Sequence, residues 1–358
     1  MTKDLLTLRD EIDAVDKKIQ ALITERAKIA ERVADAKQES QDSVFYRAER
    51  EAQVLRKVME RNDGPLSDEE MARLFREIMS ACLALEQVMS IAFLGPEGTF
   101  TQAAALKHFG HSVKTIPFAS IGDVFREVES ESVSYGVVPV ENSTEGVINH
   151  TLDEFMSSSL NICGEVILRI HHNLLSNEKD LTKITKVYSH QQSLAQCRKW
   201  LDTNMNKVKL IDVSSNAAAA ELASQEAGSA AIAGETAAEI YNLKMIAANI
   251  EDEPDNTTRF LIIGKRVTPA SGDDKTSLLI STQNRAGALL GILEPFAKHK
   301  ISMNRIESRP SRRGAWNYVF FVDIDGHQDD ENVRLALKSL SEAATMVNIL
   351  GSFPKAVL

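Results

Sequence analysis

The sequence has few cysteines, no long apolar run and no excess of positive charge. Its three cysteines, Cys82, Cys163 and Cys197, are far apart in 358 residues, so neither a disulfide framework nor a cysteine metal site is indicated. No apolar run reaches membrane-spanning length, and the N-terminus lacks the apolar core of a signal peptide. We therefore expect a cytoplasmic protein without a membrane partner.

The net charge of -10 and the absence of a basic stripe argue against a nucleic-acid partner. The negative net charge also argues against bulk electrostatic attraction of an anionic substrate, so any anion site has to be built locally. Hydrophobic residues make up 43% of the chain, which is enough for a packed core. The length allows two or three domains.

The sequence also lacks nucleotide- and metal-binding motifs. The glycines at 95 and 98 do not have the spacing of a P-loop or a dinucleotide fingerprint. His171 and His172 are adjacent, and adjacent residues of a strand face opposite ways, so we do not expect them to share a metal ion. We expect no cofactor.

Residues 4 to 39 contain neither proline nor glycine, and their apolar residues recur every three or four positions. One helix of this span would be about 54 Å long. A small domain cannot cover such a helix, so we infer a helical partner, most simply a second copy of the chain. Two further helices are expected, from about Arg47 to Glu60 and from Ser67 to Met89, the second opening with a capping-box pattern.

Several charged residues of these helices occupy inner positions. Arg26 and Lys37 are eleven residues apart, almost three turns, and so point the same way. Glu51 and Glu86 lie on or beside the apolar stripes of the next two helices. Arg9 points about 100° away from Arg26, so it could enter only a partner's cavity. The pattern favours a polar cavity for a small anion, and the alternative is a set of charges at the rim of a helix pair.

From Ser90 to about residue 266, short apolar strands alternate with helices, which indicates an α/β fold with a mainly parallel sheet. Polar joints at 95–99, 141–144, 189–191 and 214–216 follow the strands, where helix N-termini can bind anions. Each joint alone could be a simple helix cap, but together they predict a carboxylate-binding cleft. The stretch DNTTRFLIIG, residues 255–264, reads as a buried strand with a Thr-Thr-Arg entrance, which by itself could be a solvated strand end.

Residues 268–274 read as a linker, and a βαββαβ pattern of the ferredoxin-like plan follows over 276–358. Two segments stand out within it, 284–289 and 307–310, although an ordinary turn and a strand end would explain them equally. This region shows no acid–base constellation, which favours ligand binding over catalysis.

Five motifs, in this order and spacing, resemble those of the P-protein family of bifunctional chorismate mutase–prephenate dehydratases. They are GPEGTF at 95–100, PVENSTEG at 139–146, NTTRF at 256–260, GALL at 287–290 and ESRP at 307–310. The resemblance spans the whole chain. It implies an all-helical mutase domain over 1–89, a two-lobed α/β dehydratase domain similar to type 2 periplasmic binding proteins over 90–266, and an ACT domain over 276–358. It also implies an intertwined homodimer or a higher homo-oligomer.

In the helical domain the resemblance implies rearrangement of chorismate to prephenate without a covalent intermediate. Arg26 and Lys37 would hold a carboxylate and the ether oxygen, and Arg9 would come from the other subunit. Arg50 and Glu51 would belong to the second helix, with Glu51 at the ring hydroxyl.

The third helix departs from better-known members of the family, since Cys82 and Glu86 replace a serine and a glutamine. A glutamic acid donates a hydrogen bond to the ether oxygen only when protonated, so we expect mutase turnover to fall as pH rises. Arg47 stands where an aspartate is familiar and has no assigned role.

In the dehydratase domain the resemblance implies conversion of prephenate to phenylpyruvate with loss of carbon dioxide and the ring hydroxyl. Thr258 would assist the leaving hydroxyl, Arg259 would steady a carboxylate or the transition-state charge, and Phe260 completes that motif. The remaining residues expected along the cleft are Thr99, Asn142, Ser143 and Thr144. The chain would cross to the second lobe near 165–171 and return near 246–251.

In the ACT domain the resemblance implies binding of L-phenylalanine as a feedback inhibitor, at the interface of paired domains. The expected contacts are Gly287, Ala288, Leu289, Leu290, Glu307, Ser308, Arg309 and Pro310. Three alternatives stay open: a non-catalytic amino-acid sensor, a dehydratase with an inactive helical domain, and a preference for arogenate over prephenate.

Overall fold

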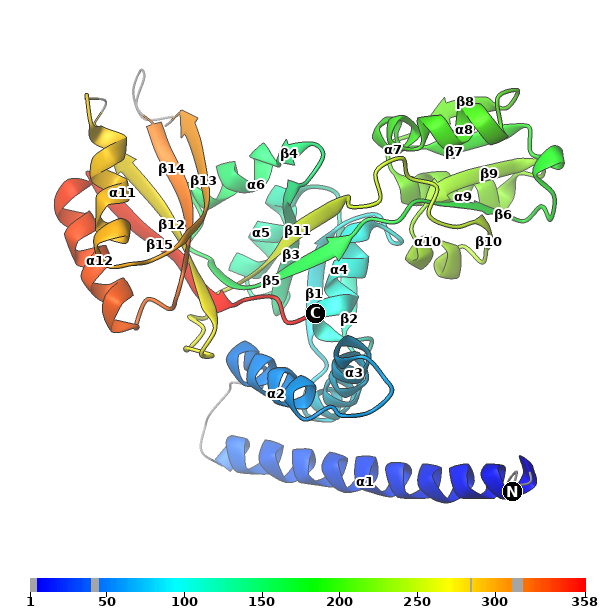
Figure 1. Cartoon of the computed structure of the whole chain (residues 1–358), viewed down its shortest axis with the longest axis horizontal. Coiled ribbons are helices and arrows are strands. Elements are labelled where there is room, and N and C mark those ends of the chain that lie inside the picture. The colour runs from blue at the N-terminus through cyan, green and yellow to red at the C-terminus, as the bar shows by residue number, and fades with distance from the viewer. Residues whose placement is uncertain (1–4, 40–44, 284, 311–317) are drawn as a thin grey trace.

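The computed structural model describes residues 5–39, 45–283, 285–310 and 318–358. The chain forms a group of helices at the N-terminus, two α/β lobes and a C-terminal sheet covered by two helices (Figure 1). Among the described residues, no helix is both long enough and apolar enough to cross a bilayer.

The N-terminal part contains α1 (Leu5–Glu39), α2 (Ala48–Glu60) and α3 (Asp68–Glu86). The three predicted helices are confirmed, although α3 ends three residues before Met89. The Ser67 side chain caps α3 by accepting a hydrogen bond from the Glu70 amide at 3.2 Å, and the Glu70 carboxylate pairs with Arg73. The apolar stripe of α1 is exposed along most of its length, with relative exposures of 39 to 64% from Leu5 to Leu22.

The first α/β lobe is built on a sheet with the strand order β2-β1-β3-β11-β5, with β4 paired to β3. Its strands are β1 (Ser90–Leu94), β2 (Lys114–Phe118), β3 (Tyr135–Asn142), β4 (Gly146–Val147), β5 (Asn161–Arg169) and β11 (Thr257–Gly264), and its helices are α4 (Phe100–Phe109), α5 (Ile121–Glu129) and α6 (Asn149–Phe155). Strand β11 runs antiparallel to both of its neighbours.

The second lobe has the strand order β10-β6-β9-β7-β8. Its elements are β6 (Asn173–Ser176), η1 (Leu181–Lys183), β7 (Lys186–Ser189), α7 (Gln191–Gln196), α8 (Arg198–Asn204), β8 (Lys209–Asp212), α9 (Asn216–Gln225), β9 (Ser229–Ala233), α10 (Glu235–Ile240) and β10 (Lys244–Ala247). The chain crosses between β5 and β6 and returns between β10 and β11, close to the predicted positions. Both sheets are mixed, so the expectation of mainly parallel sheets is wrong: a strand that returns from the other lobe, as β11 does, enters its sheet in the opposite direction.

The C-terminal part has the predicted βαββαβ order. It consists of β12 (Asp274–Thr282), α11 (Ala288–Lys298), β13 (Met303–Pro310), β14 (Tyr318–Asp325), α12 (Glu331–Ala343) and β15 (Met346–Pro354), with the strand order β13-β14-β12-β15. Helices α11 and α12 cover one face of this sheet, as Figure 1 shows.

The other face of this sheet packs against the first lobe. Val319, Phe321 and Phe353 belong to the same buried cluster as Phe155 and Leu261 of the lobe. Strand β15 also passes so close to β5 that a Cβ at Gly351 would collide with the backbone of Ile162. The C-terminal sheet and the first lobe therefore share one hydrophobic core, and displacing one exposes apolar surface of the other.

Candidate active sites

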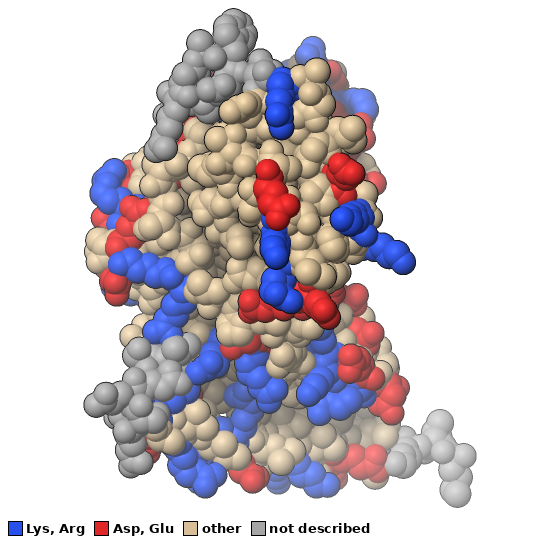
Figure 2. Space-filling model, turned by 90° about the vertical axis from the view of Figure 1, so that its left-hand side faces the viewer, with Lys and Arg blue, Asp and Glu red and all other residues tan. Residues whose placement is uncertain are grey.

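The first candidate site is a cavity of about 550 Å³ bounded by α1, α2 and α3. It brings together the predicted residues Arg26, Lys37, Arg50, Glu51, Cys82 and Glu86, and also Arg47. Four of these seven side chains are cationic and two are carboxylates, so the cavity has a net positive charge within an acidic chain. Figure 2 shows lysine and arginine side chains gathered on the lower part of the molecule, where the N-terminal helices lie. Arg9 lies outside this cavity, on the exposed N-terminal half of α1.

Lys37 is held in place before any ligand arrives. Its Nζ donates hydrogen bonds to Glu86 Oε2 and to the Phe45 carbonyl, both at 3.3 Å, and lies 5.5 Å from the centre of the Phe45 ring. The Lys37 and Glu86 side chains are both largely shielded from solvent. The residue that departs from the family pattern, Glu86, therefore contacts the cation expected at the ether oxygen.

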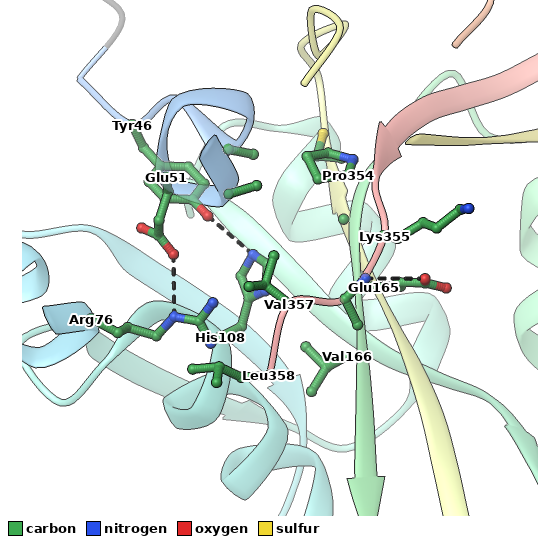
Figure 3. A pocket seen from close by; sticks show the side chains of 15 residues that line it. Tyr46, Glu51, Arg76, His108, Glu165, Val166, Pro354, Lys355, Val357 and Leu358 are labelled. Atoms are coloured by element: carbon green, nitrogen blue, oxygen red, sulfur yellow. Dashed lines mark hydrogen bonds and ion pairs between the residues drawn. The ribbon is translucent and has the colours of Figure 1, made fainter. Parts of the chain in front are cut away.

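Glu51 has a partner that the sequence analysis missed. Its Oε1 lies 3.4 Å from Nε of Arg76, a buried arginine of α3 (Figure 3). Burial raises the pKa of Glu51, and the Arg76 guanidinium acts in the opposite direction. An available signal was the stripe of Ala72, Arg76 and Ser80, which places an arginine between two small residues on the inner face of α3.

The second candidate site lies where β3 ends and β11 begins, at the joint between the two lobes. Thr258 is paired in register with Asn142, and its Oγ1 accepts a hydrogen bond of 2.8 Å from Asn142 Nδ2. Thr258 is only 8% exposed. The same Nδ2 donates to Asn256 Oδ1 at 2.9 Å, and Asn142 Oδ1 accepts from the amide and the hydroxyl of Thr144 at 3.0 and 2.6 Å. Asn142 thus organises the predicted group of Thr258, Ser143 and Thr144.

Ser143 links the two strands through Asn256, a residue that the sequence analysis did not assign. Ser143 Oγ accepts from the Thr257 amide at 2.9 Å and donates to Asn256 Oδ1 at 3.5 Å. Thr99 plays a more local part: its hydroxyl donates to the Leu94 carbonyl and caps α4 by accepting from the Gln102 amide. These contacts place Thr99 at a strand–helix joint.

Two residues outside the predicted set connect this joint to the second lobe. Gln196, the last residue of α7, donates from Nε2 to Thr144 Oγ1 at 3.1 Å and accepts at Oε1 from Asn256 Nδ2 at 3.3 Å. His172 Nε2 lies 2.7 Å from the same Oε1. Because an amide oxygen can only accept a hydrogen bond, the ring nitrogen Nε2 is the donor. Burial lowers the pKa of His172, which keeps the imidazole neutral. Gln196 and His172 lie outside the recognised motifs, so nothing in the sequence predicted that they meet at the joint between the lobes.

The structure places Arg259 away from Thr258, contrary to expectation. The Arg259 guanidinium pairs with Glu165 of β5 at 2.8 Å and with Asp323 of β14 at 2.5 Å. Successive residues of a strand face opposite sides of the sheet, so Arg259 meets the C-terminal sheet. Phe260 also differs from expectation, since it is buried in the core between the first sheet and α4.

The candidate ligand-binding segments of the C-terminal part lie at the start of α11 and along β13. Gly287 precedes α11 with a φ of 80°, a left-handed conformation that suits glycine, and Leu290 is 67% exposed. Ser308 pairs in register with Phe320, on the side of the sheet that α11 and α12 cover. Asn284, the first residue of the segment predicted at 284–289, lies outside the described residues.

Arg309, which was expected to contact L-phenylalanine, faces the first lobe instead. It pairs with Asp153 of α6 at 2.7 Å and contacts Asn149 of the same helix. Alternation along β13 explains this, because Glu307 and Arg309 face the first lobe whereas Ser308 and Pro310 face the other way. No group of three or more side chains suited to a metal ion occurs in the described ranges.

Comparisons with known proteins agree with this division of the chain. Three family models match: chorismate mutase type II over residues 8–87, prephenate dehydratase over 91–268 and the ACT domain over 276–342. The bifunctional chorismate mutase/prephenate dehydratases of Stutzerimonas stutzeri and Pseudomonas aeruginosa are 56% and 55% identical, each over 99% of this chain and 98% of the relative.

Among solved structures, the prephenate dehydratase of Arthrobacter aurescens in complex with L-Phe is similar. The two share 32% identity at a TM-score of 0.69, covering 74% of this chain and 89% of that chain. The resemblance seen in the sequence motifs is thereby confirmed. The chain belongs to the family of bifunctional chorismate mutase/prephenate dehydratases.

Proposed function

We propose that the two reactions of the family take place at two separate sites of this chain, the α1–α3 cavity and the joint between the lobes. The observation that carries this proposal is the convergence of Arg26, Lys37, Arg50, Glu51, Cys82 and Glu86 on one cavity of about 550 Å³. A net positive cavity in an acidic chain suits a small dianion. Thr258, with its ordered hydrogen-bond network, provides a separate site for the second reaction.

At the mutase site, the substrate is chorismate and the product is prephenate. The cations bind the two carboxylates and hold the enolpyruvyl side chain over the ring, so that the two reacting carbons lie close together. Lys37, already oriented by the Phe45 carbonyl, stabilises negative charge on the ether oxygen as the bond breaks. Glu51 accepts a hydrogen bond from the ring hydroxyl, and Glu86 donates to the ether oxygen in its protonated form.

A second copy of the chain covers the exposed stripe of α1 and supplies Arg9. The support is the row of apolar side chains from Leu5 to Leu22, all exposed in the single chain, together with the position of Arg9 outside its own cavity. In solution, the Ile12→Glu variant is expected to shift the sedimentation of the protein toward the monomer and to lose mutase activity. Lys18→Glu, off the stripe, is the matched control.

At the dehydratase site, prephenate loses its carboxylate and its ring hydroxyl. Asn142 donates to Thr258 Oγ1, which leaves the hydroxyl hydrogen of Thr258 to be donated to the departing ring hydroxyl. Hydroxide is a poor leaving group, so this donation lowers the barrier. Gln196 of the second lobe contacts Thr144 and Asn256 across the joint, so the second lobe forms part of the proposed site.

The ACT domain binds L-phenylalanine as a feedback inhibitor, through the start of α11 and the exposed side of β13. The exposed leucines 289 and 290 and the Gly287 turn leave room there for an apolar amino acid, and Ala288 and Ser308 flank it. Arg309 and Glu307 instead face the first lobe, where Arg309 pairs with Asp153.

We place the protein in the cytoplasm, since a reducing compartment suits its three buried, unpaired cysteines.

The test supplies purified protein with chorismate and follows prephenate and phenylpyruvate separately, with and without L-phenylalanine. Both products are expected in sequence, and phenylalanine is expected to slow the second. A chain that binds phenylalanine but converts neither substrate would be a sensor. A chain that converts only prephenate would have an inactive helical domain, and faster turnover of arogenate would reassign the substrate.

A further inference from the structure

Glu51 lies between two cavities. On one side it lines the mutase cavity, and on the other it lines a smaller, more enclosed cavity where the three domains meet (Figure 3). The smaller cavity is bounded by α2 and α3, by the end of α4, by β5 and by the last residues of the chain. Glu51 and Tyr46 line both cavities, so these two residues lie between the mutase site and the place where the three domains meet.

The partner of Glu51, Arg76, contacts both domains, through an ion pair on one side and a hydrogen bond on the other. Its Nε lies 3.4 Å from Glu51 Oε1, and its Nη1 donates a 2.7 Å hydrogen bond to the Lys107 carbonyl. Lys107 lies in the last turn of α4, where carbonyls lack helical partners and the helix dipole attracts a cation. Arg76 is only 7% exposed. A mutase carboxylate is thus tied to the backbone of the dehydratase domain through one guanidinium.

The surroundings of this link are packed and ordered. The Tyr46 hydroxyl is hydrogen-bonded to His108 Nε2 at 3.0 Å, beside Lys107. The Ala356 amide donates to Glu165 Oε1 at 3.2 Å, which brings Val357 and Leu358 over the cavity (Figure 3). A buried ion pair in such surroundings holds a fixed geometry, because both partners have lost their water and have few alternative positions.

We propose that Arg76 is a positioning residue of the mutase reaction, which holds the Glu51 carboxylate in the orientation that receives the ring hydroxyl of chorismate. It does so from a support on the dehydratase domain, the Lys107 carbonyl. The proposal rests on the assignment of Glu51 to that hydroxyl, which is part of the proposed function. It makes the geometry of the mutase site dependent on the docking of the neighbouring domain.

The charge of Arg76 has a second effect on Glu51. Only an ionised carboxylate accepts the hydroxyl hydrogen with both oxygens, and burial alone favours the protonated form. The Arg76 guanidinium lowers the pKa of Glu51, against the effect of burial. Removing Arg76 therefore raises the pKa of Glu51 and keeps the carboxyl protonated to higher pH. The charged or titratable side chains that line these cavities with Glu51 are Tyr46, Arg76, His108, Cys163, Glu165 and Lys355 in the smaller cavity and Arg26, Lys37, Arg47, Arg50, Cys82 and Glu86 in the mutase cavity.

The test uses the full-length chain with Arg76→Met, and measures mutase kcat/KM across pH together with dehydratase activity on prephenate. Misplacement of a positioned group by about 1 Å costs up to a hundredfold, so we expect a loss of mutase kcat/KM of about tenfold to a hundredfold. The acid limb of its pH profile is expected to move to higher pH. Arg76→Lys, which keeps the charge, should restore part of both. Dehydratase activity should stay within about twofold and reports that the protein is folded.

Two further variants make the result decisive. Arg73→Met, one turn earlier on the exposed side of α3, should leave mutase activity unchanged. If Arg76 acts only through Glu51, the double variant Arg76→Met with Glu51→Gln should be no worse than Glu51→Gln alone. Additive losses, an unmoved acid limb, or equal loss of both activities would overturn the proposal. If Glu51→Gln itself has no effect on mutase activity, the assignment of Glu51 fails instead.

Discussion

Thr258 and Arg259 are consecutive residues of β11 whose side chains leave the sheet on opposite faces. Thr258 Oγ1 accepts a hydrogen bond from Asn142 at 2.8 Å, on the side of the joint between the lobes. The Arg259 guanidinium lies between Glu165, at 2.8 Å, and Asp323 of the C-terminal sheet, at 2.5 Å. One short strand therefore carries the proposed proton donor on one face and a contact with the regulatory domain on the other.

Thr258→Ala is expected to remove nearly all dehydratase activity and to leave mutase activity near that of the wild type. Loss of one donor to developing charge typically costs about a hundredfold to a thousandfold in kcat. The measurement is phenylpyruvate formation from prephenate, beside prephenate formation from chorismate. The control is Thr257→Ala, whose side chain points to the other face of β11. Parallel loss of both activities would indicate a folding defect rather than a catalytic role.

Asp323→Asn is expected to weaken inhibition by phenylalanine more than it changes uninhibited turnover. The substitution removes the charge through which the ACT sheet holds Arg259, one residue from Thr258. Allosteric coupling is commonly worth about 1–3 kcal/mol, or about 5- to 150-fold in affinity. We expect the phenylalanine concentration for half-inhibition to rise by about tenfold or more, as measured with prephenate as substrate.

The matched control is Asp325→Asn, two residues along the same strand, which pairs with Lys355 within the C-terminal part. Its inhibition curve should resemble that of the wild type. An inhibition curve of Asp323→Asn that coincides with that of the wild type would mean that the signal reaches Thr258 by another route.

Glu86→Gln is expected to flatten the pH profile of the mutase. We propose that Glu86, whose Oε2 lies 3.3 Å from Lys37 Nζ, donates a hydrogen bond to the ether oxygen only while it is protonated. Turnover should therefore fall as pH rises and Glu86 becomes ionised, whereas a glutamine amide donates at every pH. The measurement is chorismate consumption from pH 5 to 9. An identical fall in the variant would show that Glu86 is not the group that titrates.

His108 is expected to make the protein less stable in mild acid. Burial, and then the Arg76 charge, lower the pKa of His108 to about 3. Between that value and the ordinary pKa of about 6.5, the unfolded chain binds a proton that the folded chain does not, so stability falls as pH falls. The slope from this group is about 1.4 kcal/mol per pH unit.

Urea unfolding of the wild type and of His108→Gln at pH 6.5 and 5.5 tests this prediction. The wild type should lose about 1 kcal/mol more than the variant over that unit, because at pH 6.5 the histidine of the unfolded chain is already half protonated. His111→Gln, at an exposed histidine beside Glu77, should lose as much as the wild type. Equal losses in all three proteins would contradict the assignment.

Removal of residues 272–358 is expected to abolish the response to phenylalanine and also to destabilise the first lobe. Val319, Phe321 and Phe353 are part of the core of that lobe, so truncation exposes apolar surface. Thermal unfolding should show a lower Tm for the truncated protein. An unchanged Tm would mean that the two parts fold independently.

The sequence alone predicted most of the helices and strands, and its helical spacing placed Arg26, Lys37, Glu51 and Glu86 toward one cavity. Arg50 and Cys82 were added only by the resemblance to the family. A helix repeats every 3.6 residues, so the spacing of Arg26 and Lys37 along α1 fixed that both face one side. The βαββαβ order of the C-terminal part followed in the same way from alternating apolar runs. The grouping of Thr258 with Asn142 was implied by the resemblance to the family, and the pairing of β11 with β3 brings the two residues together.

The groups that Arg259, Arg76 and Gln196 contact could be known only from the folded protein. The partner of Arg259 is 64 residues away in a separate domain, and the partner of Arg76 is the backbone carbonyl of Lys107, which has no residue-specific signal. The alternation of side chains along a strand predicts that Thr258 and Arg259 point to opposite faces of the sheet, but it does not predict which residues lie against each face. That choice depends on how the domains pack, and the energy of packing comes from buried surface contributed by every domain at once.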